Sequence, residues 1–285
     1  KRFDVKDGLG LVRLAQMEGM PSLTIAAGRM LLASLLLTPI AWRYGRHELL
    51  HLPRRTLWPG VLAGLFLALH FATWISSLDY TSVASSVALV STDPLWVGLV
   101  SVLFLHERLR WGIIGGIVLT IAGSALIAFS DSSTGAGTYA APLFGDMLAL
   151  LGSITASGYV VIGSTLRKDL SLLAYIWLVY TSSAVILLLI QLLAGQSLSG
   201  YTSLGYLYVL LLAVGPQLLG HSSFNWALRY LSPTFVAISI LGEPIGASLL
   251  AWLLFGETFA PLQLPGFVLL LVGISVATID SVRKQ

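Results

Sequence analysis

Long apolar runs separated by short polar segments dominate the chain and predict membrane-spanning helices. A helix crosses the apolar core of a bilayer with about 20 predominantly apolar residues. Four such runs lie in the first half of the chain, at Pro21–Trp42, Thr56–Leu78, Ser82–Leu105 and Trp111–Phe129. The second half holds five, at Pro142–Leu166, Leu170–Leu193, Leu204–Tyr230, Ser232–Phe255 and Ala260–Ile279. The pattern therefore predicts an all-α polytopic membrane protein.

The beginning of the chain departs from this pattern. Five of the first seven residues are charged, and the apolar part of Lys1–Gln16 is too short to cross a bilayer. The second half has a full span, Pro142–Leu166, before Arg167, whereas the first half has only twelve residues before Arg13. We therefore expect the first membrane helix to be short, truncated or altered in this chain.

Two stretches 150 residues apart share one design. Ser82–Glu107 is an apolar run that carries an acid and a helix breaker, Asp93-Pro94, near its middle, and Ser232–Glu257 carries Glu243-Pro244 at the corresponding place. A constant offset that is held without a gap indicates an internal duplication. The same offset relates Tyr80 to Tyr230, Glu107 to Glu257, Gly116 to Gly266 and Gly123 to Gly273.

Composition agrees with a membrane protein. Apolar types make up 56% of the 285 residues and charged types 10%, with a mean hydropathy of +0.87, whereas a soluble domain has about 25% charged residues. The net charge of +3 comes from basic residues between the apolar runs, so we infer neither an acidic partner nor nucleic acid binding. The chain has no cysteine, which excludes disulfides and thiolate metal sites.

Lys and Arg occur in alternate connections along the chain, and this distribution predicts the orientation of the helices. The basic connections are Arg43–Arg55, Arg108–Arg110, Arg167-Lys168, Arg229 and the tail, and those without Lys or Arg are Asp79-Tyr80, Ser130–Ala141, Gly195–Thr202 and Gly256–Thr258. We expect the basic set and both termini to be cytoplasmic. Residues 1–130 and 142–285 then form two repeats of opposite orientation, joined by an extracytoplasmic connection at 131–141. Inverted repeats are typical of secondary transporters, which bind their substrate near the midplane of the membrane.

Several motifs follow one another in the same order in both halves. The first half has Trp74, Leu78-Asp79-Tyr80, Asp93-Pro94, Leu105-His106-Glu107-Arg108-Leu109 and Gly116…Gly123, and the second has Trp226-Ala227-Leu228-Arg229-Tyr230, Glu243-Pro244, Gly256-Glu257 and Gly266…Gly273. This order resembles the half-repeat of the EamA family of the drug/metabolite transporter (DMT) superfamily, over most of residues 13–280. The resemblance implies ten membrane helices in two inverted five-helix repeats, with a central cavity that opens alternately to each side. It also implies a place in the bacterial cytoplasmic (inner) membrane. Members of the family mostly export amino acids, related metabolites or toxic small molecules, and some import.

Asp93 and Glu243 are the first candidates for function. A charge at the centre of a membrane helix costs roughly 2.5–3.5 kcal/mol. The proline that follows each acid frees a carbonyl one turn earlier, which is tolerated only where it is buried in protein or faces water. One interpretation is a cavity wall that carries a protonatable group. The other is a structural hinge whose acid pairs with a neighbour such as Arg29, and a hinge can itself serve transport.

Polar stripes lie inside two spans that the duplication relates. Residues four apart on a helix share one face, so a polar stripe within a span is expected to face the bundle rather than lipid. Both stripes then line one cavity, in which a histidine is suited to carry protons; the alternative is hydrogen bonding between helices, worth about 0.6–2 kcal/mol. The stripes are His70, Trp74 and Ser77 in the first half, Gln217, His221 and Asn225 in the second, and a further candidate at Asp146, Ser153 and Ser157.

Arg29 is the only basic residue deep in a predicted span. It is suited to hold a substrate carboxylate or to balance Asp93 or Glu243. Aromatic residues inside spans are suited to line a cavity for an apolar or aromatic solute, although membrane aromatics often anchor at interfaces instead. They are Trp74, Trp96, Trp177, Tyr180 and Trp226.

Glycines in GxxxG spacing predict close helix packing. The pairs are Gly60/Gly64, Gly112/Gly116 and Gly242/Gly246. Glu107 and Glu257 stand at helix ends, where we expect them to cap helices or tie loops.

The chain lacks the P-loop, HExxH and GxSxG motifs, so we predict no enzyme activity, no cofactor and no pumping driven by ATP. The prediction is a secondary transporter that works by alternating access, exports small amino-acid-like or xenobiotic solutes, and couples to protons. An importer or facilitator of the same fold is the alternative, and a channel or a membrane enzyme acting on lipid are the rivals from other classes. The candidate substrate-binding residues are Arg29, His70, Trp74, Asp93, Trp96, Tyr180, Gln217, His221, Asn225 and Glu243.

Overall fold

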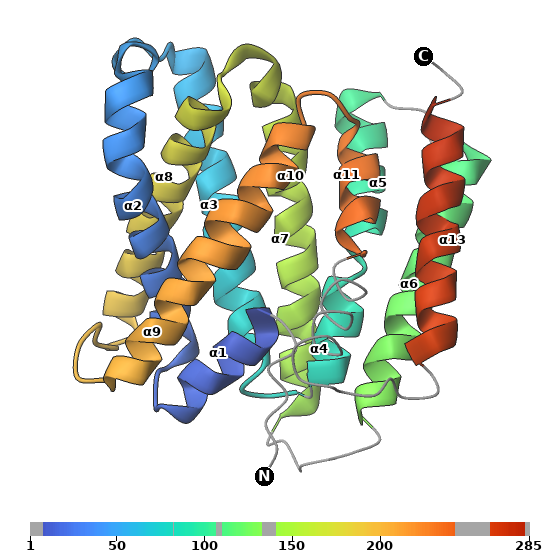
Figure 1. Ribbon diagram of the computed structural model, residues 1–285, viewed down its shortest axis with the longest axis horizontal. Coiled ribbons are helices and arrows are strands. Elements are labelled where there is room, and N and C mark those ends of the chain that lie inside the picture. The colour runs from blue at the N-terminus through green and yellow to red at the C-terminus, as the bar shows by residue number, and fades with distance from the viewer. Residues whose placement is uncertain (1–7, 82, 107–109, 133–140, 243–262, 283–285) are drawn as a thin grey trace. The chain divides into compact units, whose positions relative to one another are not determined.

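The computed structural model describes residues 8–81, 83–106, 110–132, 141–242 and 263–282, which form helices and the turns between them (Figure 1). The chain divides into two compact units. Unit 1 comprises residues 1–75 and 158–230, and unit 2 comprises residues 76–157 and 231–285. Each unit therefore combines corresponding parts of the two halves that the 150-residue offset relates.

Unit 1 is built mainly from long helices. The helix α2 packs along α8, and α1 packs against α9 (Figure 1). In chain order the helices are α1 (Gly8–Met17), α2 (Ser22–Leu50), α3 (Arg54–Ser77, whose last two residues belong to unit 2), the second part of α7 (Pro142–Asp169), α8 (Leu172–Leu193), α9 (Ser203–Leu212), η1 (Ala213–His221) and α10 (Ser222–Ala227).

Two glycines of α3 allow a close approach to α8. A Cβ on Gly64 would lie 3.0 Å from the carbonyl oxygen of Val179, and a Cβ on Gly60 would collide with the side chain of Leu178. Small residues let helix backbones meet in this way. The predicted close packing at Gly60 and Gly64 is confirmed.

The helix α2 is longer than its apolar run, and the prediction of a loop over Arg43–Arg55 is wrong for most of its length. The helix continues to Leu50, and only residues 51–53 connect it to α3. Arg, Glu and Leu in this stretch are good helix formers, and a helix continues beyond the apolar run where its sequence favours it. The extension is tied to α8, because Glu48 Oε1 accepts a hydrogen bond from the backbone N–H of Ser171 at 2.8 Å.

The segments α9, η1 and α10 follow one another without a break, as the predicted span Leu204–Tyr230 requires. Their middle part, η1, has the wide turns of a π-helix and contains Pro216. Proline lacks the N–H that would bond to the carbonyl one turn earlier. A wider turn accommodates this loss, and such turns occur frequently at functional sites.

Unit 2 contains shorter helices. They are α4 (Val83–Val90), α5 (Asp93–Leu105), α6 (Trp111–Ser132), the first part of α7, α11 (Pro233–Ile240) and α13 (Gln263–Val282). The helices α6 and α13 run side by side along most of their length (Figure 1).

Glycines bring α6 and α13 into backbone contact. A Cβ on Gly116 would lie 2.8 Å from the carbonyl oxygen of Gly273, and a Cβ on Gly123 would lie 2.7 Å from that of Gly266. A Cβ on Gly112 would lie 2.6 Å from the Asp280 side chain. The two helices are antiparallel, since the later glycine of α6 meets the earlier glycine of α13. The predicted close packing at Gly112 and Gly116 is confirmed.

The predicted span Ser82–Leu105 is two helices rather than one. The helix α4 ends at Val90 and α5 begins at Asp93, with Ser91 and Thr92 forming the turn between them. The break falls at the acid-proline pair, as expected from the missing N–H of Pro94. In the second half, α11 ends at Ile240; Glu243, Pro244, Gly246 and Glu257 lie outside the described residues, as does Glu107.

Within the described residues, five helices are long and apolar enough to cross a membrane: α2, α3, α7, α8 and the continuous run Ser203–Ala227. Shorter apolar helices are α5 and the segments Trp111–Leu126 and Leu264–Ala277. The helix α1 has 10 residues, which rise about 15 Å, against an apolar core of about 30 Å. The expectation of a short, truncated or altered first membrane helix stays a prediction, because residues 1–7 lie outside the described residues.

Candidate functional site

A group of polar side chains is buried inside unit 1, and we call it the polar cluster. It consists of Arg29 on α2, Tyr159 on α7, Tyr180 on α8, Gln217 on η1 and Asn225 on α10. Each of these side chains is at most 4% exposed. Polar groups buried this deeply among membrane helices are costly unless they are hydrogen-bonded.

Arg29 and Gln217 form one half of the polar cluster. The Nε–H of Arg29 donates to Gln217 Oε1 at 3.1 Å. The guanidinium also lies 4.1 Å above the centre of the Phe71 ring, where the negative face of the ring attracts a cation. The cation that the sequence places in the membrane is therefore held by an amide and an aromatic ring.

Asn225 joins two tyrosines in the other half of the polar cluster. The Tyr159 hydroxyl donates to Asn225 Oδ1 at 2.8 Å, and Asn225 Nδ2 donates to the Tyr180 hydroxyl at 3.4 Å. The Tyr180 hydroxyl also lies 3.2 Å from Ser222 Oγ and 3.4 Å from the carbonyl oxygen of Gln217. This last contact connects the two halves.

Aromatic rings border the polar cluster. The His221 ring meets Phe71 edge-on at 5.4 Å between ring centres and lies 6.2 Å from Tyr159. His70 stacks on Trp74 at 5.5 Å with 14° between the ring planes. The two predicted stripes therefore come together in unit 1, through Phe71, which the sequence pattern did not single out.

Ser77 departs from its predicted stripe. It lies at the end of α3, in unit 2, and its Oγ is 2.7 Å from Ser86 Oγ of α4. The i+7 spacing does put Ser77 on the same helix face as His70. However, α3 extends from unit 1 into unit 2, so His70 belongs to unit 1 and Ser77 to unit 2. Ser77 ties α3 to α4 instead of joining the polar cluster.

Arg167 is buried, although the sequence placed it in a basic connection. It lies in the last turn of α7 and is 1% exposed, whereas the neighbouring Lys168 is exposed. Its Nε–H donates to the carbonyl oxygen of Asn225 at 2.9 Å, and its Nη1 donates to the carbonyl oxygen of Leu170. Both acceptors lie at helix carboxyl ends, where unpaired carbonyls and the helix dipole favour a cation.

Sequence reasoning missed both Tyr159 and Arg167. They are eight residues apart on α7, which puts them on one helix face. This spacing is the signal in the sequence that could have grouped them. In the structure both contact Asn225, Tyr159 through its side chain and Arg167 through its backbone carbonyl.

Asp93 lies in unit 2, at the start of α5, and its side chain is 9% exposed. Among the described residues its carboxyl group has no hydrogen-bond or ion-pair partner. Beside it, Thr92 Oγ1 donates to the carbonyl oxygen of Leu89 at 2.6 Å, accepts from Trp96 Nε1 at 3.2 Å and lies 3.2 Å from Ser153 Oγ. The pairing of Arg29 with Asp93 or Glu243 stays a prediction.

Other predicted aromatics make contacts of their own. The indole N–H of Trp177 donates to Thr38 Oγ1 at 3.0 Å. Trp226 is 55% exposed and packs on Tyr230. Trp96 is half-buried in unit 2. Of the predicted aromatic residues, Tyr180 is the member of the polar cluster.

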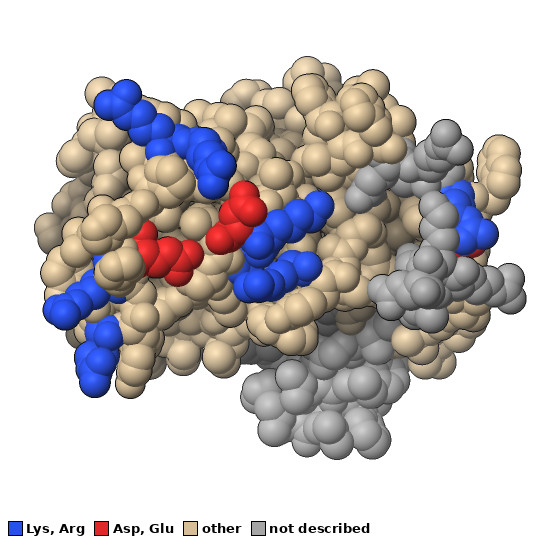
Figure 2. All heavy atoms as spheres, turned by 90° about the horizontal axis from the view of Figure 1, so that it is seen from above, with Lys and Arg blue, Asp and Glu red and all other residues tan. Residues whose placement is uncertain are grey.

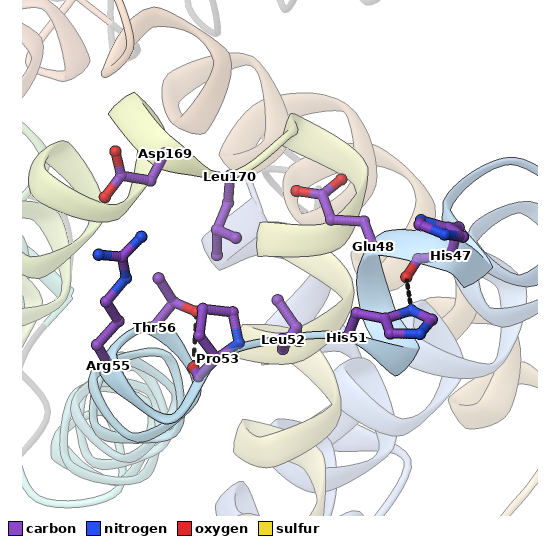
Figure 3. Close-up of a pocket in the computed structure, with 9 residues that line it drawn as sticks. All are labelled: His47, Glu48, His51, Leu52, Pro53, Arg55, Thr56, Asp169 and Leu170. Atoms are coloured by element: carbon purple, nitrogen blue, oxygen red, sulfur yellow. Dashed lines mark hydrogen bonds between the residues drawn. The ribbon is translucent and has the colours of Figure 1, made fainter.

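A pocket of about 200 Å³ lies at the ends of α2 and α7 in unit 1, apart from the polar cluster (Figure 3). Its polar lining comes from His47 and Glu48 of α2, His51 of the connection to α3, Arg55 and Thr56 of α3, and Asp169 of α7. Lys and Arg side chains gather at this end of the helices, with acidic side chains among them (Figure 2). In the described part of the chain, no group of three or more His, Asp or Glu is arranged to hold a metal ion.

Comparison with known proteins decides the family. A family model described as "EamA-like transporter family" matches residues 10–129 and 143–279. The chain belongs to this family. The resemblance drawn from the repeated acid-proline and glycine motifs is thereby confirmed.

Relatives of this EamA-like transporter carry transporter names. It is 28% identical over 251 residues to a protein of Escherichia coli (strain K12) named "Uncharacterized inner membrane transporter YedA", covering 86% of this chain and 78% of that protein. It is 22% identical over 218 residues to "Uncharacterized transporter YdfC" of Bacillus subtilis (strain 168), covering 76% and 70%.

A solved crystal structure of another protein has the same fold. It matches with a TM-score of 0.77 over 97% of this chain and 96% of that chain, at 18% sequence identity. The family match identifies a membrane transporter that is embedded in lipid and takes small molecules as substrates. In this EamA-like transporter, the polar cluster holds a cation, amides and phenol hydroxyls beside aromatic rings.

Proposed function

We propose that this EamA-like transporter is a proton-coupled secondary transporter that exports small amino-acid-like or xenobiotic solutes across the bacterial cytoplasmic membrane by alternating access. The observation that carries the proposal is the polar cluster of unit 1. In this proposal its amides and phenol hydroxyls bind the polar part of a solute, Arg29 orients the Gln217 amide, and Phe71 and His221 pack against the apolar part. Sites for small molecules combine apolar walls with a few convergent polar groups in this way.

Helix contacts in unit 2 support two inverted repeats, at 1–130 and 142–285, each of five helices. The contacts are Gly116 with Gly273 and Gly123 with Gly266. The 150-residue offset relates Gly116 to Gly266 and Gly123 to Gly273, so replacing each glycine by its counterpart turns one contact into the other. This is expected when a two-fold axis relates the two helices. Because the helices are antiparallel, this axis lies across them, which is the relation expected of inverted repeats. Both termini are then cytoplasmic.

The break between α4 and α5 supports proton coupling at Asp93. Its carboxyl group is buried beside a helix break, and among the described residues it lacks a partner. A carboxylate in such surroundings is costly, whereas the protonated acid is neutral. Protonation of Asp93, with Glu243 as its counterpart in the second repeat, is the proposed coupling step, and the two acid-proline stretches are the proposed gates.

Solute counterflow in proteoliposomes tests the proposed function. Vesicles are loaded with one unlabelled solute from a panel of amino acids and cationic dyes, and entry of the labelled solute is followed with and without an imposed pH gradient. We expect saturable counterflow of one solute class that responds to the gradient. Steady conductance without counterflow would identify a channel, and saturable flux that ignores pH would remove Asp93 and Glu243 from the coupling role.

A further inference from the structure

The side-chain amide of Gln217 has one end occupied and one end unpaired. Its Oε1 accepts from Arg29 Nε at 3.1 Å, and its Nε2 has no hydrogen-bond partner among the described residues. The orientation of this amide is not arbitrary, because a guanidinium only donates hydrogen bonds and so must face the oxygen. The NH2 group is therefore held away from Arg29, with two N–H donors available.

The other two amides that the described part of the chain buries are used differently. Asn225 donates from Nδ2 to the Tyr180 hydroxyl, and Gln191 donates from Nε2 to Thr24 Oγ1 and to the carbonyl oxygen of Gln196, each at 3.4 Å. Both NH2 groups thus have acceptors. Gln217 is 0% exposed and has none. Buried donors without acceptors are rare in folded proteins, and each one calls for an explanation.

The surroundings of Gln217 favour a ligand as that explanation. Gln217 lies in the wide turn η1, its carbonyl oxygen meets the Tyr180 hydroxyl, and its side chain meets Arg29. The unpaired donor is therefore part of the polar cluster. A solute with an acceptor oxygen would complete the bonding of this amide, whereas a solute without one would leave it unsatisfied.

We infer that Gln217 Nε2 donates a hydrogen bond to the transported solute, and that the solute carries an acceptor oxygen, as in a carboxylate or carboxamide. Arg29 acts on the solute through Gln217, as a positioning residue that fixes the direction of the amide. This inference rests on the proposed function and names the chemical group that the polar cluster selects.

The variant Gln217→Glu tests the inference with little change of shape. A glutamate still offers an oxygen to Arg29, and with a charge, so we expect the melting temperature of the purified protein to stay the same or rise. It replaces the NH2 group by a second oxygen, which repels an acceptor oxygen. We expect the KM of an amino acid in counterflow to rise about tenfold or more.

Paired probes identify the acceptor oxygen. Each amino acid, such as leucine or phenylalanine, is compared with the amine that remains when its carboxylate is removed, isoamylamine or phenethylamine. We expect the wild-type protein to prefer the amino acid and Gln217→Glu to lose that preference. A preference that is the same in both proteins would overturn the inference.

The variant Gln191→Glu is the matched control. It makes the same chemical change at an equally buried amide of α8, but there the NH2 group already has acceptors. We expect its melting temperature to fall and its KM to stay the same, which is the opposite pattern. If Gln217→Glu does not fold, Gln217→Met takes its place, and the KM ratio of the paired probes is read on the folded fraction.

The outcomes separate this inference from the proposed function. A wild-type protein without counterflow of any probe would contradict the transporter proposal itself. A wild-type protein that transports, together with a Gln217→Glu variant of unchanged KM, would contradict only the role of Gln217 and leave its amide as packing for Arg29.

Discussion

The two compact units take corresponding parts of a duplicated sequence and differ in what they bury. Unit 1 buries polar side chains, which are joined through the amides of Gln217 and Asn225. Unit 2 brings the α6 and α13 backbones together over glycines, and its helix α5 begins at the buried carboxyl group of Asp93. Each half of the duplicated sequence contributes to both units. We propose that the units have different roles, with recognition of the solute in unit 1 and coupling in unit 2.

The largest effect is expected where unit 2 has no space. Gly123→Ala puts a Cβ 2.7 Å from the carbonyl oxygen of Gly266 and 2.9 Å from the backbone nitrogen of Leu270, so the helices must separate. Overpacking typically destabilises by about 1–3 kcal/mol, and we expect the upper end, because backbone atoms cannot rotate away. Thermal unfolding in detergent measures this. Gly115→Ala is the control, since nothing lies within 4 Å of its Cβ; equal melting temperatures in the two variants would refute the tight α6–α13 contact.

Removal of a buried cation in unit 1 comes next. Arg167→Met leaves the carbonyl oxygens of Asn225 and Leu170 without their side-chain donor. An unsatisfied buried acceptor costs about 1–3 kcal/mol, so we expect a lower melting temperature together with a raised KM, because the Asn225 backbone is no longer held. Lys168→Met, at the exposed neighbour, is expected to change neither quantity. A variant with wild-type KM would show that Arg167 only stabilises the fold.

A change confined to unit 2 tests the division of labour directly. Asp93→Asn keeps the shape of the side chain and removes the group that takes up a proton. We expect flux to lose its response to an imposed pH gradient while the KM changes by less than about twofold. The exposed Asp169→Asn, in unit 1, is the control and should keep the response. A gradient response that persists in Asp93→Asn would assign coupling elsewhere.

The smallest effect is expected from a single hydroxyl of unit 1. Tyr159→Phe removes the donor to Asn225 Oδ1 and leaves the ring in place. One hydrogen bond contributes about 1 kcal/mol, so we expect the KM to rise about fivefold in counterflow, with an unchanged response to the pH gradient. Tyr44→Phe, at a tyrosine that is 75% exposed, should match the wild type. Loss of the response to the pH gradient in Tyr159→Phe would show that unit 1 takes part in coupling as well as in recognition of the solute.

Local chemistry made several features predictable. The break between α4 and α5 follows from the proline after Asp93, and the close packing at Gly64 and Gly116 follows from the missing Cβ. Arg29, Gln217 and Asn225 stood out because polar groups are costly inside an apolar run. These are properties of single residues and their immediate neighbours along the chain.

The end of α2 and the partners of the polar residues were not predictable in the same way. The loss of apolar character after Trp42 marks the edge of the apolar run, but the helix itself continues to Leu50, because helix formation does not depend on lipid. Tyr159 looked like an ordinary aromatic residue, and Arg167 looked like part of a basic connection. Only the structure brings both of them to Asn225.

The sequence by itself determined that this chain is a duplicated, helical membrane protein of the EamA type, because apolar length, proline, glycine and the constant offset act locally or by simple repetition. The tertiary structure decided which helix faces are covered. A lipid-facing surface and a buried surface are equally apolar, so a membrane helix carries little periodic signal that separates them. Contacts between segments far apart in the chain, such as Arg29 with Gln217 and Tyr159 with Asn225, therefore emerge only when the helices pack.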